Sequence, residues 1–173
     1  MSNILIVDDE QSICDSLTGI FMDEGLSPSS VNSGKAALAR LEEERPDLVL
    51  LDIWMPGMDG LETLKALKQT NLESYVVMLT VSNNESDVTD ALRLGADGYL
   101  LKDMEPESVL EHIQIAASGR LTITDSLTEL LARALRDDGR PKTPNEAGLT
   151  NREEEILNLI STGMSNKQIA REL

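Results

Sequence analysis

Residues 48–60 of this chain read LVLLDIWMPGMDG, and this stretch decides the fold. Four apolar residues end in the carboxylate of Asp52, and a loop that contains proline and glycine follows. A short apolar run bounded by turn residues is typical of a buried strand. Such a strand delivers its acid to the carboxyl edge of a sheet, where open α/β sheets bind their ligands. Asp52 is therefore the first candidate for a functional residue.

A second acidic cluster, Asp8, Asp9 and Glu10, follows the apolar run ILIV at residues 4–7 in the same way. Two neighbouring parallel strands would place Asp8, Asp9 and Asp52 in one small pocket. Carboxylates at that separation repel one another, and each raises the pKa of its neighbours. A bound divalent cation keeps them ionised, and clustered hard oxygen ligands suit Mg²⁺. The pattern therefore predicts a magnesium site on these three acids.

Strand-like apolar runs alternate with helical periodicity five times, which predicts an α/β fold with a parallel sheet. Pro28 adjoins the second run, and because proline lacks a backbone donor, that strand belongs at a sheet edge. The second strand is an edge in the doubly wound order 2-1-3-4-5, and we adopt this known order for the fold. The predicted strands are Ile4–Val7, a weak one near Ser29–Val31, Leu48–Leu51, Tyr75–Leu79 and Gly98–Leu101.

Helices are predicted between these strands from apolar residues spaced at i, i+3, i+4 or i+7. Ser33, Asp59 and Ser86 each precede a helical run and are predicted as N-cap residues. Glu62 lies three residues after Asp59, which is the spacing of a capping box. The chain should therefore contain five strand–helix repeats.

The alternation stops after Gly119. The spacing of Leu127, Leu130, Leu131 and Ala134 predicts one more amphipathic helix, and the polar run DDGRPKTPNEAG that follows is typical of a linker. The last run, LTNREEEILNLISTGMSNKQIAREL, predicts two short helices. We therefore expect three segments: a domain at 1–120, a linker with one helix at 121–148, and an all-α fragment at 149–173.

Charge and cysteine content limit the classes of function. The formal net charge is −16, and residues 1–120 hold 22 of the 31 acidic side chains, so this domain should not bind nucleic acid by itself. Cys14 is the single cysteine, so an intrachain disulfide is excluded and a reducing cytoplasm is expected. From its first residues we expect no signal peptide, and the sequence contains no apolar run of membrane-spanning length.

Two further polar residues stand where strands end. Thr80 follows VVML, and Lys102 follows DGYLL, three residues after Tyr99. Together with the three acids they place carboxylates, a hydroxyl, an aromatic ring and a lysine along one sheet edge. In order and spacing, residues 3–118 resemble the receiver domain of two-component response regulators.

The resemblance implies a role for each acid. Asp52 would accept a phosphoryl group from the phosphohistidine of a sensor histidine kinase, because carboxylates are known covalent acceptors of this kind. Asp9 and Asp52 would bind Mg²⁺ directly, together with the backbone carbonyl of Trp54. Asp8 would act mostly through metal-bound water.

The resemblance also implies a switch. Mg²⁺ and the ammonium of Lys102 would neutralise charge on the phosphoryl oxygens. Thr80 would donate its hydroxyl to the attached phosphoryl group, and Tyr99 would turn inward behind it. This movement would reshape the face built from the fourth helix, fifth strand and fifth helix. Release of the tail and formation of a homodimer on phosphorylation both remain open.

The tail at 149–173 resembles the start of the LuxR-type helix-turn-helix of the NarL/FixJ family, and the pair Lys102-Asp103 matches the NarL-like members. Residues 1–60 resemble nitrogen-regulator-type receivers more than NarL-like ones, and this resemblance leaves a hybrid or designed origin open. Asn151 and Glu154 stand where the family usually has Pro and Arg. The resemblance implies promoter DNA as a partner of the full-length parent, but we expect no recognition helix in this truncated chain, which should not read DNA.

Two other functions compete with transcription control. A stand-alone receiver in a phosphorelay would act only through protein contacts, but it would have no use for the LuxR-type tail. An aspartyl-phosphate hydrolase would need a second acid two residues after the nucleophile, and that position is Trp54. We therefore expect no enzyme. His112 is expected to be a solvated surface residue, and Cys14 a small buried apolar group.

Overall fold

A parallel sheet of six strands forms the centre of the fold in the computed structural model, which describes residues 3–70 and 73–137. Its order is β2-β1-β3-β4-β5-β6, and every neighbouring pair is parallel. The strands are β1 (Asn3–Val7), β2 (Ser27–Val31), β3 (Leu48–Leu51), β4 (Tyr75–Thr80), β5 (Gly98–Leu101) and β6 (Thr122–Ile123).

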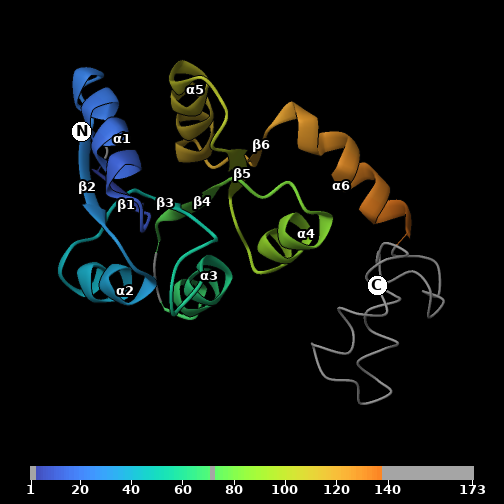
Figure 1. Cartoon of the computed structure of the whole chain (residues 1–173), viewed down its shortest axis with the longest axis horizontal. Helices are drawn as coiled ribbons and strands as arrows, with labels where there is room; N and C mark the ends of the chain where they lie inside the picture. Colours follow the sequence, from blue (N-terminus) through green and yellow to red (C-terminus); the bar gives the residue numbers. More distant parts are fainter. Residues whose placement is uncertain (1–2, 71–72, 138–173) are drawn as a thin grey trace, which may run out of the picture. The chain divides into compact units, whose positions relative to one another are not determined.

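Helices cover both faces of this sheet. Figure 1 shows α1 and α5 on one face and α2, α3 and α4 on the other. The helices are α1 (Gln11–Asp23), α2 (Gly34–Glu43), α3 (Gly60–Lys68), α4 (Glu85–Arg93), α5 (Pro106–Ala117) and α6 (Asp125–Asp137). The doubly wound fold and the order 2-1-3-4-5 of its first five strands are therefore confirmed.

The central strands are mostly apolar because both of their faces are buried. Successive side chains alternate between the two faces, so Leu5 and Val7 pack with α2 and α3, whereas Ile4 and Ile6 pack with α1 and α5. The four side chains of β1 that follow Asn3 are each 1% exposed. Burial of one such side chain stabilises the fold by about 1.5–3 kcal/mol.

The edge position of β2 is confirmed, and Pro28 lies in this strand opposite Ile4 of β1. Proline is tolerated there because no further strand needs its missing N–H. At the opposite edge, β6 is a strand that the sequence pattern did not predict. It has two residues, which is too short to show a period-2 pattern.

The predicted helix starts are correct for α2 and α3 but not for α4. Ser33 caps α2, and Asp59 and Glu62 form a complete capping box on α3. The prediction for Ser86 was wrong, because the N-cap of α4 is Asn84, whose side chain accepts a hydrogen bond from the backbone N–H of Ser86. Asn is at least as good a cap as Ser, and here it comes first in the chain.

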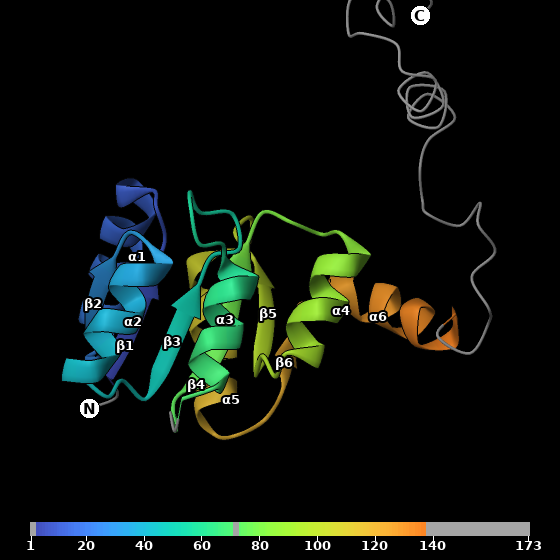
Figure 2. The same ribbon diagram turned by 90° about the horizontal axis from the view of Figure 1, so that it is seen from below.

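The predicted amphipathic helix exists as α6. Leu127 is 1% exposed, and Leu130 packs against the same apolar cluster. In Figure 1 and in the turned view of Figure 2, α6 begins beside β6 and lies next to α4. The chain divides into two units, residues 1–135 and 136–173.

Most of the second unit lies outside the described residues. The part of the predicted linker after residue 137 and the helices expected at 149–173 fall there, so the predicted segment boundaries stay predictions. Among the residues that are described, no helix has the length and apolar character needed to cross a membrane.

Candidate functional site

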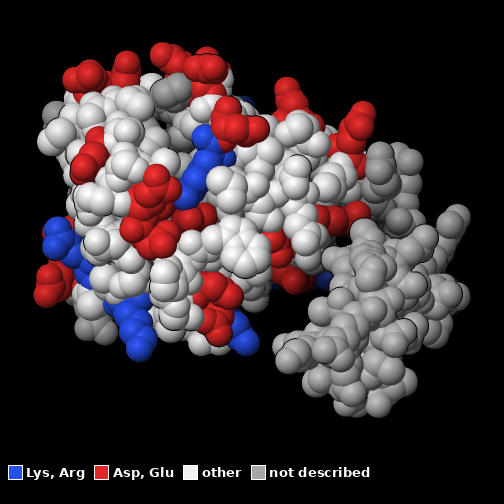
Figure 3. All heavy atoms as spheres, in the orientation of Figure 1, with Lys and Arg blue, Asp and Glu red and all other residues white. Residues whose placement is uncertain are grey.

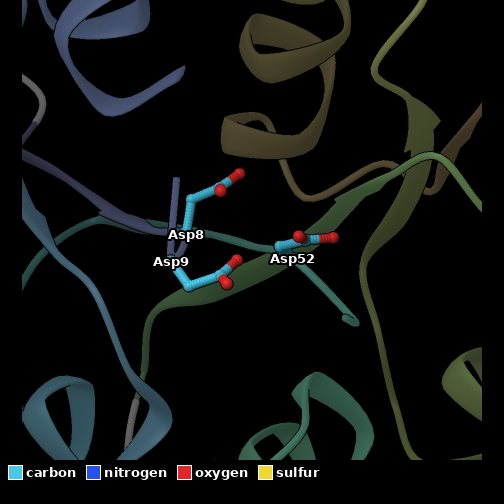
Figure 4. Close-up of side chains that lie close together, drawn as sticks. All are labelled: Asp8, Asp9 and Asp52. Atoms are coloured by element: carbon cyan, nitrogen blue, oxygen red, sulfur yellow. The ribbon is translucent and has the colours of Figure 1, made fainter. Parts of the chain in front are cut away.

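The three predicted acids meet at the carboxyl edge of the sheet. Asp8 and Asp9 follow β1, Asp52 follows β3, and the pairing of Val7 with Leu51 brings the two strand ends side by side. One carboxylate oxygen of each acid lies within 4.8 Å of the others, as Figure 4 illustrates. Asp8 and Asp52 are 2% and 4% exposed, whereas Asp9 is open to solvent.

Backbone N–H groups orient the two buried carboxylates. Oδ1 of Asp52 accepts a hydrogen bond from the backbone N–H of Ile53 at 2.7 Å. Oδ1 of Asp8 accepts one from the backbone N–H of Glu10 at 3.0 Å. Each carboxylate therefore keeps a defined direction, which is what a preorganised binding site requires.

Lys102 joins the two buried acids. Its Nζ lies 2.6 Å from Oδ2 of Asp8 and 2.7 Å from Oδ2 of Asp52, and its side chain is 12% exposed. Lys102 follows β5, and its backbone N–H donates to the carbonyl of Thr80 at 2.9 Å. The ends of β1, β3 and β5 thus bring the carboxylates and the ammonium to the same point.

Burial and pairing act in opposite directions on these charges. Burial raises the pKa of Asp8, and the hydrogen bond from Lys102 only partly offsets this effect. Burial works against the charged ammonium of Lys102, yet its hydrogen bonds to Asp52 and Asp8 outweigh burial, so the pKa of Lys102 is raised. With three carboxylates against one ammonium, the pocket keeps an excess of negative charge.

The donor set of the pocket fits a hard divalent cation. All three candidate ligands are carboxylate oxygens, which are hard donors of the kind that bind Mg²⁺. A divalent charge would balance the excess that Lys102 leaves. The acidic cluster is therefore consistent with Mg²⁺ binding.

Thr80 and Tyr99 are connected through Ser82. Thr80 ends β4 and is fully buried, and its Oγ1 accepts a hydrogen bond from the backbone N–H of Ser82 at 3.3 Å. Tyr99 is also fully buried, and its hydroxyl donates to the carbonyl of Ser82 at 3.0 Å. Burial raises the pKa of Tyr99 to about 12, while its bond to Ser82 acts the other way, so the phenol stays a neutral donor. The inward position of Tyr99 is thus observed, and its movement on phosphorylation stays a prediction.

Sequence reasoning missed Ser82, because a serine in a loop carries no periodic signal. Its place two residues after Thr80 was the available clue. Trp54 lies in the loop after Asp52 with 61% of its surface exposed, and the metal-binding role of its carbonyl stays a prediction. The expectation for His112 was wrong, because this residue is half-buried and its Nδ1 contacts Oγ1 of Thr122.

Comparisons with known families agree with this geometry. Residues 4–114 match the family described as "Response regulator receiver domain", and residues 147–173 match "Bacterial regulatory proteins, luxR family". The chain is 41% identical to the nitrate/nitrite response regulator protein NarL of Escherichia coli (strain K12), over 99% of this chain and 81% of that protein. It is 39% identical to the nitrate/nitrite response regulator protein homolog of Haemophilus influenzae, over 84% of this chain and 67% of that protein.

Solved structures show the same fold. The chemotaxis protein CheY4 of Vibrio cholerae is 30% identical, with a TM-score of 0.65, over 67% of this chain and 98% of that one. A LuxR-family response regulator from Aurantimonas is 20% identical, with a TM-score of 0.73, over 79% of this chain and 99% of that one. At that identity the second likeness supports the fold alone. The acidic pocket agrees with the two family matches and with the relative that matches almost the whole chain. This protein therefore belongs to the two-component response regulators, as a NarL-like member with a receiver domain and a luxR-family DNA-binding segment.

Proposed function

We propose that Asp52 is the residue on which this response regulator receives a phosphoryl group from its sensor histidine kinase. The observation that carries the proposal is the position of Asp52 in the strand order. β3 lies between β1, which brings Asp8 and Asp9, and β4, which brings Thr80. A phosphoryl group on Asp52 would therefore reach the other acids on one side and Thr80 on the other, beside the ammonium of Lys102.

The transfer itself needs little more than positioning and charge compensation. An oxygen of Asp52 forms a bond to phosphorus, the P–N bond to the kinase histidine breaks, and its electron pair stays on the imidazole nitrogen. Lys102 neutralises charge on the phosphoryl oxygens. Asp9, Asp52 and the carbonyl of Trp54 would hold Mg²⁺ directly, with Asp8 acting through water. When bound, the ion would supply further compensation of this charge.

The same residues would then register the acyl phosphate. Thr80 donates its hydroxyl to the attached group, and its neighbour Ser82 moves with it. Because Ser82 also holds the hydroxyl of Tyr99, the inward position of that ring depends on the loop. The face formed by α4, β5 and α5 changes as a result, and pairing of two receivers through it is one consequence that we propose.

The output is control of transcription, because the luxR-family match at 147–173 has no role in a stand-alone relay protein. Acidic side chains gather over the outer surface of α1 and α5 in Figure 3, and they would repel the phosphates of DNA. Contact with promoter DNA therefore belongs to the luxR-family segment.

We further propose that the protein is a regulator and not a hydrolase, working in the cytoplasm with its kinase. Trp54 occupies the position two residues after Asp52, where a hydrolase would need a proton-transferring acid, and an indole cannot supply one. Cys14 is buried and unpaired by a disulfide, in keeping with a reducing compartment.

Phosphorylation by a small donor tests the proposal. The full chain is incubated with acetyl phosphate and Mg²⁺, and the mass gained is mapped to a peptide. The wild type should gain one phosphoryl group on Asp52, Asp52→Asn should gain none, and the exposed-site control Asp23→Asn should behave like the wild type. A folded Asp52→Asn variant that is labelled as fast as the wild type would defeat the assignment.

A further inference from the structure

The sixth strand ties the linker to the backbone of Tyr99. β6 pairs with β5 so that Thr122 lies opposite Gly98 and Ile123 opposite Tyr99. Just after β6, the backbone N–H of Thr124 donates to the carbonyl of Tyr99 at 3.2 Å. The hydroxyl of Thr124 approaches the same carbonyl at 3.4 Å. The residue whose ring is proposed to move is therefore also the residue that the linker holds.

The fit between β6 and β5 is close. A Cβ added to Gly98 would lie 2.6 Å from Cγ2 of Thr122 and 2.9 Å from its carbonyl oxygen, so this approach depends on glycine. On the other side, His112 of α5 contacts the hydroxyl of Thr122, which is 4% exposed. The start of the linker is thus attached to both β5 and α5.

The first turns of α6 continue this contact on the opposite face. Leu127 is 1% exposed and belongs to the same apolar cluster as Tyr99 and as Val88 and Ala91 of α4. The ring of Tyr99, the inner side of α4 and the start of α6 therefore pack as one group. Close-packed groups of this kind change between discrete arrangements and do not deform gradually.

A continuous set of contacts runs from the pocket to the linker. The N–H of Ser82 donates to Oγ1 of Thr80, the hydroxyl of Tyr99 donates to the carbonyl of Ser82, and Thr124 donates to the carbonyl of Tyr99. Tyr99 makes the two contacts with different groups. Its side chain contacts the loop at Ser82, and its backbone carbonyl contacts the linker. Any shift of the ring and of β5 must alter the surface on which β6 and α6 rest.

We infer that the start of the linker, residues 122–131, is the first element outside the pocket to respond to phosphorylation. These residues dock on β5 and α4 of the same chain. Their docking is coupled through Tyr99 to the phosphoryl site at Asp52. The inference rests on the proposed role of Asp52. It also means that the edge of β5 is already occupied, so a second copy could use this edge only by displacing β6.

Coupling between two sites is reciprocal, which makes the inference testable from the pocket. In the structure the inward ring of Tyr99 and the docked α6 occur together, so loosening α6 should weaken the state that the phosphoryl group favours. The ligand is beryllofluoride with Mg²⁺, used as a phosphoryl mimic on the full chain. The single tryptophan, Trp54, stands two residues from Asp52 and reports binding by its fluorescence.

Three variants of α6 separate coupling from general damage. Leu127→Ala removes the buried contact and should weaken apparent beryllofluoride affinity by about fivefold or more. Leu127→Met keeps the volume and should restore nearly wild-type affinity. Thr128→Ala changes an exposed neighbour in the same turn and should have no effect. A folded Leu127→Ala variant with wild-type affinity would overturn the inference.

Amide hydrogen exchange on the wild-type chain gives a second test that needs no variant. Beryllofluoride should slow exchange several-fold at the amide of Thr124 and across residues 122–131. Slowing that is confined to the loop around Ser82, with no change at 122–131, would refute the coupling while leaving the role of Asp52 intact. A wild type that shows no Mg²⁺-dependent response at Trp54 would instead overturn the proposed function, and the coupling with it.

Discussion

Replacement of Lys102 by methionine tests the electrostatics of the pocket most directly. Methionine keeps most of the aliphatic stem but removes the ammonium, so the change isolates the charge. Oδ2 of Asp8 and Oδ2 of Asp52 would each lose a partner that now lies at 2.6 Å and 2.7 Å. Both carboxylates would remain buried beside one another without a counter-charge.

The expected loss of stability follows from these distances and from burial. With an effective dielectric constant of about 20, each contact corresponds to a gross attraction of about 6 kcal/mol. Removal of Lys102 also abolishes the cost of desolvating its ammonium, which is several kcal/mol for a side chain this deeply buried. Removing one partner of a buried pair therefore costs a net ~3–5 kcal/mol. A domain stable by about 5–15 kcal/mol should still fold, but with a much lower unfolding midpoint.

The stability lost by Lys102→Met should become smaller as the pH falls. Burial already raises the pKa of Asp8 in the folded state above its ordinary value of 3.8, and Lys102 limits the rise. Without Lys102 the pKa rises further, so the folded state binds protons more strongly than the unfolded state between the two pKa values. Stability then increases as the pH falls toward the unfolded value. The difference between variant and wild type should therefore be smaller at about pH 5 than at about pH 7.5.

Urea unfolding followed by circular dichroism measures these differences, with and without millimolar Mg²⁺. The control is Lys68→Met, because Lys68 pairs with Asp97 at 2.8 Å but the two side chains are 29% and 31% exposed. Exposed pairs of this kind contribute about 0–1 kcal/mol. Mg²⁺ should stabilise Lys102→Met more than the wild type. If Lys102→Met loses no more stability than Lys68→Met near neutral pH, the description of the pocket as a buried anionic cluster held by Lys102 is wrong.

Three further changes probe the surroundings of the pocket. Gly60→Ala should destabilise the fold by about 1–3 kcal/mol and slow acetyl phosphate labelling, because the new Cβ would lie 2.0 Å from the carbonyl oxygen of Asp52. An unchanged labelling rate and an unchanged melting temperature would contradict this prediction. Tyr99→Phe should cost about 0.5–1.5 kcal/mol in urea unfolding, because the carbonyl of Ser82 loses a buried donor, and an equal or higher stability would argue against that bond. Titration with Mg²⁺ should change the fluorescence of Trp54 and raise the melting temperature, and a titration without effect on either signal would count against a metal in the pocket.

Much of the fold could be predicted from the sequence because several strands end where an apolar run meets a polar or charged residue. Apolar runs stop at Asp8, Asp52, Thr80 and Lys102, and parallel strands all end at the same edge, so one-dimensional spacing is enough to bring these residues together. Glycine and proline between the runs separated the elements. The boundaries of β3 and β5 were therefore predicted to the residue.

The features that were missed depend on tertiary contacts and not on local pattern. β6 exists because Thr122 and Ile123 meet the free edge of β5, and nothing in a two-residue segment signals this. The double contact of Lys102 with Asp8 and Asp52 likewise needs the distance across three strands. The sequence pattern predicts that Lys102 is charged and lies near the acids. It does not predict how many carboxylates Lys102 contacts, because that number depends on the folded pocket.

The two outer strands of the sheet have a consequence for solubility. One edge contains Pro28, and the opposite edge is only two residues long. Exposed edges that are long and regular recruit strands from other chains and start amyloid-like growth, whereas a proline or a very short edge discourages it. We expect concentrated preparations of this regulator to resist cross-β aggregation, and any contact between copies to be made by helices.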